Sequence, residues 1–350
     1  MQSSVKKNKT LLVFSAFFYA ISVILMIIGT VFDLQISKTV FDPQNGFALM
    51  FEAFGQFVYW GMWGPIFAVL FLTSHNLNEC LEIIGKVFPF IRPVKNTQTN
   101  TYKFFNTAVT VFFKILFFVL GIIGWKKLVE NVLKHIFDLP QLFYFAVCAV
   151  ITALAIFAFS RMKKETLYKL EALALAGVLF GIFLKLLENA KQITGRIRFR
   201  EMVAASNGFF DDKGLSFGKT ENLATRLNKS MVGITDFSAF APWYKINTSS
   251  GIYSHTDSFP SGHTSYSCTL FLSVLFFNAF DKLKKFSPVA AIFSFLYILV
   301  MGFSRIVAGA HYLTDVAGAM IIAYTLFLAV NFIYSKFISK GIFPTVNKKN

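Results

Sequence analysis

The chain has 350 residues, of which 55% are hydrophobic and only 15% are charged, and its mean hydropathy is +0.58. A soluble globular protein of this length does not carry so much apolar surface, so the composition predicts a membrane protein with several spans. The formal net charge of +16 does not indicate nucleic-acid binding, because the basic residues flank apolar runs and form no stripe alternating with stacking aromatic residues. Three widely spaced cysteines indicate neither a disulfide framework nor a metal site.

Apolar runs long enough to cross a bilayer recur along the chain, and they predict about eight transmembrane helices in an all-α polytopic membrane bundle. A basic segment precedes the first run and no small-residue cleavage site follows it, so we expect a retained helix and not a signal peptide. The predicted helices cover residues 11–31, 56–72, 106–125, 142–160, 170–190, 264–280, 288–303 and 311–334.

Three stretches outside these runs are more polar. Residues 32–55 are expected to form an amphipathic segment on the outer surface, and residues 126–140 a short amphipathic connector. Residues 192–259 form the only long polar region, and their composition predicts turns and loops rather than a separate domain. Lys185 and Glu188, at helical spacing, are expected to form a local ion pair.

The distribution of lysine and arginine predicts the orientation. With an even number of spans both termini lie on one side, and the connectors on that side carry most of the basic residues, including the cluster from Arg161 to Lys164. The positive-inside rule then places both termini in the cytoplasm. We therefore expect a multi-pass protein of the cell membrane, with the connectors that follow residues 190 and 303 facing outside.

The segment from Ser304 to Asp315 lies between the last two predicted helices. If the last helix starts near His311, Asp315 lies one turn further on the same face, where its carboxylate can hold the imidazole in one tautomer. That arrangement prepares a histidine nucleophile. Arg305 adds a permanently charged guanidinium whose fork fits two phosphate oxygens.

A second polar segment, from Phe259 to Thr264, opens another apolar run. Ser261 is placed as a helix-start residue, and Gly262 lets the backbone approach a ligand closely. A helix start presents free N–H groups to an anion, so this segment predicts a phosphate contact beside His263.

A third segment follows the run 170–190. Lys191 and Arg198 are seven residues apart and share one face if the segment is helical, whereas Arg196, five residues from Lys191, is expected to face away. Each of the three segments thus places phosphate-binding side chains at the end of a predicted membrane helix.

In this order, Lys-x6-Arg, Pro-Ser-Gly-His and Ser-Arg-x5-His-x3-Asp resemble the three-part signature of the type 2 phosphatidic acid phosphatase superfamily, which also includes glucose-6-phosphatases and vanadium haloperoxidases. The resemblance covers roughly residues 170–334. Phe199 stands where the family has proline, so either ring packing steers Arg198, or Arg196 or Arg200 takes over its contact. The predicted division is N-terminal transmembrane helices in 1–169, the catalytic core in 170–335, and a basic cytoplasmic tail in 336–350.

The resemblance implies a phosphatase in which His311, oriented by Asp315, forms a phosphohistidine while His263 protonates the leaving oxygen and later activates water. The same resemblance implies that the phosphate oxygens are held by Lys191, Arg198, Ser261, the Gly262 N–H and Arg305. No metal or other cofactor is expected, because cationic side chains supply the positive charge.

The position of these segments at one membrane face favours a membrane lipid as the substrate. Phosphatidic acid, phosphatidylglycerol phosphate and undecaprenyl pyrophosphate all fit, because the motifs bind phosphate and not the lipid tail. The oligomeric state stays open.

Other kinds of protein share parts of this pattern. A transporter would gather polar residues along a path at the bilayer midplane, whereas here they gather at one face. A haloperoxidase shares the oxyanion pocket, but that branch is soluble. A non-catalytic lipid-phosphate-binding protein would lack part of the nucleophilic set, which is complete here. For His75, His135 and His255 we expect structural roles, with His255 close enough to the second motif to line the pocket.

Overall fold

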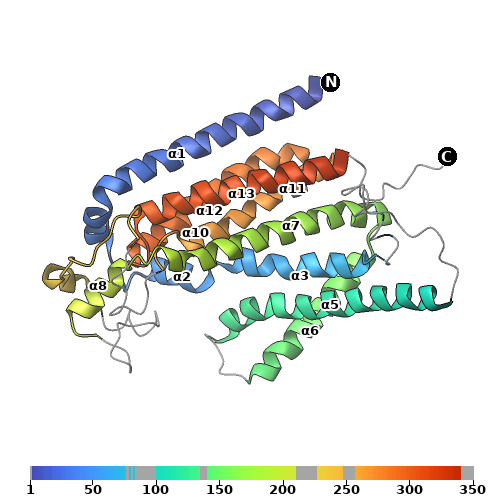
Figure 1. Cartoon of the computed structure of the whole chain (residues 1–350), viewed down its shortest axis with the longest axis horizontal. Helices are drawn as coiled ribbons and strands as arrows, with labels where there is room; N and C mark the ends of the chain where they lie inside the picture. The colour runs from blue at the N-terminus through green and yellow to red at the C-terminus, as the bar shows by residue number, and fades with distance from the viewer. Residues whose placement is uncertain are drawn as a thin grey trace. The chain divides into compact units, whose positions relative to one another are not determined.

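The computed structural model describes residues 2–75, 79, 82, 100–134, 140–209, 227–246 and 257–339 (Figure 1). These residues form helices, turns and extended segments, and no strand occurs among them, which confirms the all-α fold. In this part of the chain seven helical stretches are long and apolar enough to cross a membrane, which indicates a multi-pass membrane protein. They are Leu12–Val40, Gly46–Leu72, Tyr102–Glu130, Gln141–Ser160, Lys164–Ala190, Lys284–Val307 and Leu313–Lys336.

The chain divides into two compact units. The first contains residues 1–56, 182–271 and 289–327, and the second contains residues 57–181, 272–288 and 328–350. The helices of the first unit are α1 (Gln2–Val40), α2 (Gly46–Phe54), the end of α7 (Lys164–Ala190), η1 (Lys191–Ile193), α8 (Phe199–Ser206), η2 (Lys229–Ile234), α10 (Gly262–Ser267), η4 (Cys268–Phe271), most of α12 (Ser287–Val307) and the first part of α13 (Leu313–Ser339).

In the first unit, α1 packs against α13 (Figure 1). The ring of Phe18 stacks on that of Tyr324 with centroids 4.3 Å apart, and the hydroxyl groups of Ser15 and Tyr324 lie 2.8 Å apart. A second hydroxyl pair at 2.8 Å joins Tyr19 to Thr325. Polar pairs of this kind stabilise helix contacts inside a membrane, where neighbouring lipid offers no competing partner.

The N-terminal helix is longer than predicted. Instead of a surface segment over 32–55, α1 continues to Val40, and a short turn then leads into α2. The reason is that polar side chains in this stretch face the protein: Asp33 is 4% exposed and Ser37 is fully buried. The turn contains Pro43, which cannot continue the helical hydrogen bonds, and the side chain of Asn45 caps α2 by accepting from the N–H of Ala48.

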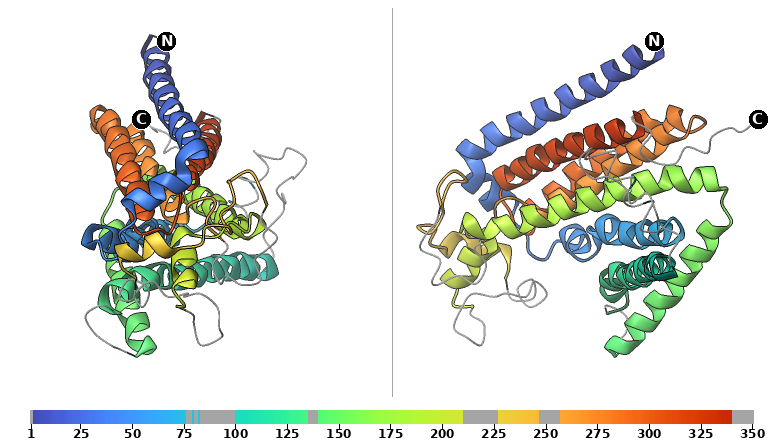
Figure 2. Two further views of the ribbon diagram at one scale, coloured as in Figure 1. Left: turned by 90° about the vertical axis from the view of Figure 1, so that its left-hand side faces the viewer. Right: turned by 45° about the vertical axis from the view of Figure 1, so that its right-hand side comes forward.

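The second unit contains α3 (Phe57–Leu72), α5 (Asn100–Lys134), α6 (Gln141–Ser160), the first part of α7, α11 (Leu272–Ala279) and η5 (Lys284–Phe286). Within it α3, α5 and α6 pack against one another (Figure 2). Glycine permits the close approach of α3 and α5, because a Cβ on Gly64 would lie 1.8 Å from Nε1 of Trp125. The helix α5 is also longer than predicted, because it includes part of the expected connector 126–140.

The sixth predicted helix, 264–280, consists of three consecutive pieces, α10, η4 and α11. Hydroxyl groups bond back to main-chain carbonyls in this stretch: Ser265 to Ser261, Ser267 to His263, and Thr269 to Tyr266, at 2.7–2.9 Å. Such bonds compete with the regular helical pattern and bend helices. This stretch is not among the seven long apolar helices found in the described part of the chain.

Candidate active site

The loop between α12 and α13 holds Arg305 and His311 in a fixed relation. Gly309 has φ +63°, and its N–H bonds to the carbonyl of Ile306 while that of Ala310 bonds to the carbonyl of Arg305. This pair of bonds is the Schellman arrangement that ends a helix at a left-handed residue. A Cβ on Gly309 would also lie 2.5 Å from the ring of Phe41, so a side chain has no room here. The chain therefore stops α12 just after Arg305 and turns His311 into the protein.

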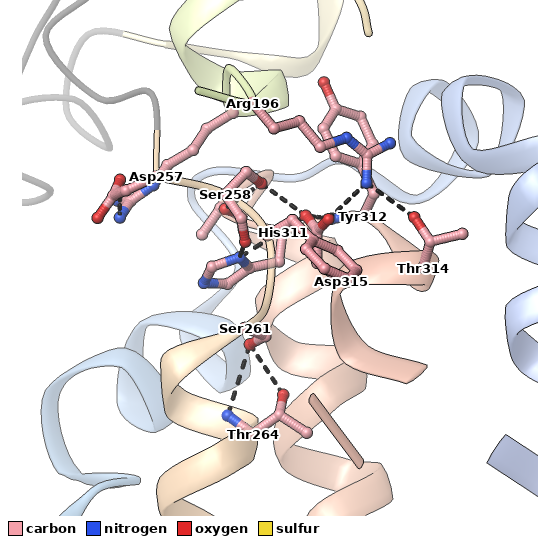
Figure 3. Close-up of polar contacts among 12 residues, drawn as sticks. Arg196, Asp257, Ser258, Ser261, Thr264, His311, Tyr312, Thr314 and Asp315 are labelled. Carbon is pink, nitrogen blue, oxygen red and sulfur yellow. Dashed lines mark hydrogen bonds and ion pairs between the residues drawn. The ribbon is translucent and has the colours of Figure 1, made fainter. Parts of the chain in front are cut away.

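His311 is buried, with 2% of its surface exposed, and it precedes α13 instead of opening it. Its Nδ1 lies 2.6 Å from the carbonyl oxygen of Ser258 and 3.8 Å from Oδ2 of Asp315 (Figure 3). A carbonyl only accepts, so Nδ1 carries the proton and the neutral ring keeps an unprotonated Nε2. The Asp315 carboxylate thus lies beside the ring at helical spacing, as expected, while the main chain of Ser258 makes the shorter contact.

Asp315 organises the loop around His311. Its Oδ2 accepts from the N–H of Tyr312 at 2.8 Å and from the hydroxyl of Ser258 at 2.6 Å (Figure 3). The first bond is the back-bond of a capping box, in which an acid three residues into a helix satisfies the N–H of the capping residue. The second fixes Ser258, whose carbonyl holds His311. Asp315 thus acts on His311 chiefly through Ser258.

The second motif forms the start of α10. Ser261 is its N-cap: the Ser261 Oγ accepts from the N–H of Thr264 at 3.5 Å and from the Thr264 hydroxyl at 2.9 Å, which leaves its own proton to donate (Figure 3). The Ser261 N–H donates to the main-chain carbonyl of Asp315 at 3.0 Å, so the second and third motifs are joined directly. The Nε2 of His263 lies 3.4 Å from the carbonyl of Glu52.

Lys191 opens η1, directly after α7, and is 5% exposed. A Cβ on residue 262 would lie 2.5 Å from its Nζ, so Gly262 leaves the space that the ammonium group occupies. On the same turn, Glu188 pairs with Lys185, as predicted, and also accepts a hydrogen bond from the hydroxyl of Tyr266. The first and second motifs therefore meet at Lys191 and Gly262.

The first motif is not one continuous helix. After α7 and η1 the chain is not helical from 195 to 198, so the expected helical register between Lys191 and Arg198 is wrong. Arg198 is the N-cap of α8, with φ −74° and ψ 147°, and its Nη2 pairs with Asp257 at 2.8 Å. Its buried Nε has no hydrogen-bond partner in the described part of the chain.

Phe199 occupies the first position of α8, which is also the helix position that best tolerates proline. Its fully buried ring packs on Phe41, with centroids 5.1 Å apart, and stacks on Phe237 at 5.5 Å. A proline at position 199 would favour an extended backbone at Arg198. Here the backbone of Arg198 is extended without proline, and the residue that follows is a packed phenylalanine. Of the alternatives that the sequence left open, ring packing is the one that the structure contains.

Arg305 is 1% exposed, and its Nη2 pairs with Oε2 of Glu52 at 3.1 Å. Its Nε and Nη1 are buried and have no hydrogen-bond partner among the described residues. Glu52, on α2, also accepts from Arg200 at 3.1 Å. Glu52 therefore binds Nη2 of Arg305, and the Nε and Nη1 nitrogens of the guanidinium stay available to donate to another acceptor.

Arg196 does not face away from the site, contrary to the prediction from helical spacing. It is 1% exposed, its Nε donates to the carbonyl of Ala241 at 2.9 Å, and its Nη1 donates to Thr314 and to Oδ1 of Asp315 (Figure 3). Its Nη2 pairs with Asp33 at 2.8 Å. All three nitrogens of Arg196 are thus engaged within the protein, which distinguishes it from Arg305.

Burial and neighbouring cations set the charge of the site. Burial lowers the pKa of His311 to about 4, even though the neighbouring Asp315 carboxylate raises it, and Lys191 lowers it further. Burial, followed by the charge of Arg305, lowers the pKa of His263 well below its usual 6.5. Burial, followed by the charge of Arg198, lowers the pKa of Lys191 to about 8. Both imidazoles are therefore neutral at physiological pH, and Lys191 is mostly charged.

The sequence reasoning missed Asp33, Glu52 and Ser258 as parts of this cluster. The available signal was an acidic residue in an apolar stretch, since an ionisable group within a membrane helix usually has a functional partner. His255, expected near the pocket, and the tail beyond 339 lie outside the described residues. His75, in the second unit, bonds to Glu79 and Glu171, in agreement with a structural role.

Comparison with known proteins gives one family. Residues 225–339 match the family model described as the PAP2 superfamily, and this range includes the second and third motifs but not Lys191 and Arg198. Neither a curated protein nor a solved structure matches the chain. The match supports a phosphoester hydrolase. The segment that carries both histidines of the site therefore matches the model of the PAP2 superfamily, the family that its motifs resemble.

Proposed function

We propose that this protein hydrolyses a lipid phosphate or pyrophosphate through a phosphohistidine at His311. The observation that carries the proposal is the hydrogen bond between Nδ1 of His311 and the Ser258 carbonyl, which leaves Nε2 as a buried lone pair beside several cations. A neutral imidazole is a nucleophile, and the low pKa of His311 keeps it neutral throughout the physiological range.

The phosphate group would be held by donors that have no other acceptor. In the described part of the chain, Nε and Nη1 of Arg305 and Nε of Arg198 are buried without a partner, an arrangement that is costly unless a ligand uses it. Lys191, beside Gly262, and the free proton of Ser261 add further donors at the start of α10. Together they supply charge-assisted hydrogen bonds to the equatorial oxygens of phosphorus.

His263 would transfer the proton of the leaving group. Its lowered pKa means that the free protein holds it neutral, so it needs a proton when substrate binds. A phosphate anion next to the ring favours the imidazolium form and raises that pKa, which makes His263 an acid once the site is occupied. After the alcohol or phosphate product leaves, the neutral ring can accept a proton from the water that attacks the phosphohistidine.

The surroundings of the site favour a lipid substrate. Lys191 follows a long apolar helix, and Arg305 and His311 lie between two more, so a phosphate bound there sits at the ends of membrane spans. The basic connectors, including Arg161 to Lys164, support cytoplasmic termini and a site at the outer face. Phosphatidic acid, phosphatidylglycerol phosphate and undecaprenyl pyrophosphate are the candidates that this chemistry accommodates.

The test is phosphate release by the purified full-length protein in detergent, with these three lipids and a water-soluble sugar phosphate as substrates and a metal chelator present throughout. We expect turnover of at least one lipid, undiminished by the chelator and lost in His311→Ala. Tight binding of these lipids without phosphate release would contradict hydrolysis. Preference for the sugar phosphate would contradict the lipid assignment alone.

A further inference from the structure

The N-cap residue of α13 carries no side chain that can accept from the first N–H groups of the helix. Tyr312 occupies the N-cap position, and tyrosine offers no oxygen that reaches back to the first N–H groups of its helix. The acceptor comes instead from α1: Oδ1 of Asp33 accepts from the N–H of Thr314 at 3.0 Å, and Oδ2 accepts from the Thr314 hydroxyl. Asp33 thus performs the capping role from a helix 281 positions away in the chain.

The same carboxylate holds the arginine that binds Asp315. Oδ2 of Asp33 pairs with Nη2 of Arg196 at 2.8 Å, and Nη1 of Arg196 pairs with Asp315. Asp33 is 4% exposed, and Arg196 and Asp315 are 1% and 0% exposed, so solvent does not screen these pairs. Burial lowers the pKa of Arg196, but the charges of Asp315 and Asp33 more than offset it and raise that pKa, so the guanidinium stays charged.

Two aromatic rings and a main-chain hydrogen bond also hold Arg196 in place. Its guanidinium lies 4.1 Å from the ring centroid of Tyr312 and 5.5 Å from that of Phe240. Its carbonyl accepts from the N–H of Ser258 at 3.0 Å, and the Ser258 carbonyl in turn holds Nδ1 of His311. One arginine therefore touches both residues that determine the placement of the nucleophile.

We propose that Asp33 is a positioning residue for the reaction: by capping α13 and clamping Arg196 against Asp315, it sets the position of the His311 ring. The inference rests on the proposed function. It places part of the catalytic support on α1, outside the 225–339 segment that matches the family model. Asp33 touches neither histidine in any contact that we observe, so its effect passes through Arg196, Thr314 and Asp315.

This role predicts a distinct kinetic signature. The phosphate-binding donors of Arg305 and Lys191 do not contact Asp33, so substrate affinity should persist when the carboxylate is lost, whereas the nucleophile should lose its alignment. In Asp33→Asn, one side-chain oxygen is replaced by a donor that faces donors of Arg196 and Thr314. We expect kcat to fall about 10- to 100-fold, the range typical of a displaced reacting group, with KM changed less than about twofold.

The matched control is Ser37→Ala, which removes another buried polar group one turn further along α1. Arg196→Lys should reproduce the fall in kcat, and the double variant Asp33→Asn/Arg196→Lys should fall less than the product of the two single effects, because both act on one clamp. Thermal unfolding in detergent and inhibition by inorganic phosphate show whether each variant is folded with an intact anion site.

Hydrogen–deuterium exchange of residues 308–318 supplies a readout that does not need activity. We expect faster exchange there in Asp33→Asn than in Ser37→Ala or wild type. Unchanged exchange, or wild-type kcat in a folded Asp33→Asn protein, overturns the inference. If wild-type protein releases no phosphate from any substrate while exchange still responds to Asp33→Asn, the proposed function fails and the positional role of Asp33 stands.

Discussion

His311 Nδ1 lies 2.6 Å from the main-chain carbonyl of Ser258, whereas the Asp315 carboxylate is 3.8 Å away. The group that orients the imidazole is therefore the main-chain carbonyl of Ser258. Asp315 stabilises the position of that carbonyl indirectly, by accepting a hydrogen bond from the Ser258 hydroxyl. Removing Asp315 should disturb the loop more than it changes the tautomer, because the carbonyl still requires a donor at Nδ1.

The first prediction concerns the atom that becomes phosphorylated. Because Nδ1 donates to Ser258, the phosphoryl group should be trapped on Nε2 of His311, and His311→Ala should abolish both trapping and turnover. Rapid quenching at alkaline pH followed by phosphorus NMR distinguishes the two nitrogens. Phosphate on Nδ1, or on another residue, would falsify this assignment. Asp315→Asn should turn over at a heavily reduced rate while still forming Nε2-phosphohistidine.

The second prediction concerns the protonation of the nucleophile. Burial lowers the pKa of His311 to about 4, and a lowered pKa for a cationic acid means that the neutral ring persists to lower pH. Histidine NMR of the substrate-free protein should show a neutral His311 until the pH falls to about 4. His75 is an internal control, since its hydrogen bond to Glu171 raises its pKa above the usual 6.5. A His311 signal that titrates above that of His75 would contradict the buried site.

The third prediction concerns the alkaline side of the activity profile. Burial lowers the pKa of Lys191 to about 8, so the ammonium is present below that pH and is lost as the pH rises through it. We expect KM to rise above about pH 8 because a charged phosphate contact disappears. Lys191→Arg should retain activity at pH 9 relative to pH 7 better than wild type, since a guanidinium stays charged. If activity falls above about pH 8 in Lys191→Arg as much as in wild type, a group other than Lys191 causes the fall.

The fourth prediction separates Arg198 from Arg196. Arg198 keeps a buried Nε without a partner among the described residues, so Arg198→Ala should raise KM and lower turnover by at least about tenfold through loss of a phosphate contact. Arg196 is engaged at all three nitrogens, so Arg196→Ala should reduce kcat and leave KM nearly unchanged. Measurement of kcat and KM for both variants shows which arginine binds the phosphate. The reverse pattern would make Arg196 the phosphate ligand.

The fifth prediction concerns orientation in the membrane. From the basic connectors we expect Lys164 to lie in the cytoplasm and Lys229, in η2, to lie outside. Both positions are exposed, so each accepts a cysteine without a cost in packing. A membrane-impermeant thiol reagent should label Lys229→Cys in intact cells and Lys164→Cys only after lysis. Labelling in the opposite order would put the site in the cytoplasm and remove lipids presented at the outer face from the candidates.

The amino-acid sequence by itself determined the membrane class and the helical fold, and its motifs predict the chemical type of the site. Apolar runs of bilayer length depend only on composition along the chain, so helices such as α6 were located to within one residue. The motifs around His263 and His311 depend on short spacings, and the structure has His263 at the start of α10 and His311 in the loop between α12 and α13.

Only the tertiary structure decided which charged side chains meet across long separations. Helical spacing placed Arg196 away from the site, but the chain leaves the helix after α7, and Arg196 reaches Asp33 and Asp315 instead. The packing of Phe199 could not be predicted from local sequence either, because its partner Phe41 lies far away in the chain. Local pattern specifies backbone and side-chain type, whereas pairing of buried charges depends on which helices pack together, and that packing places Asp33 of α1 over the start of α13.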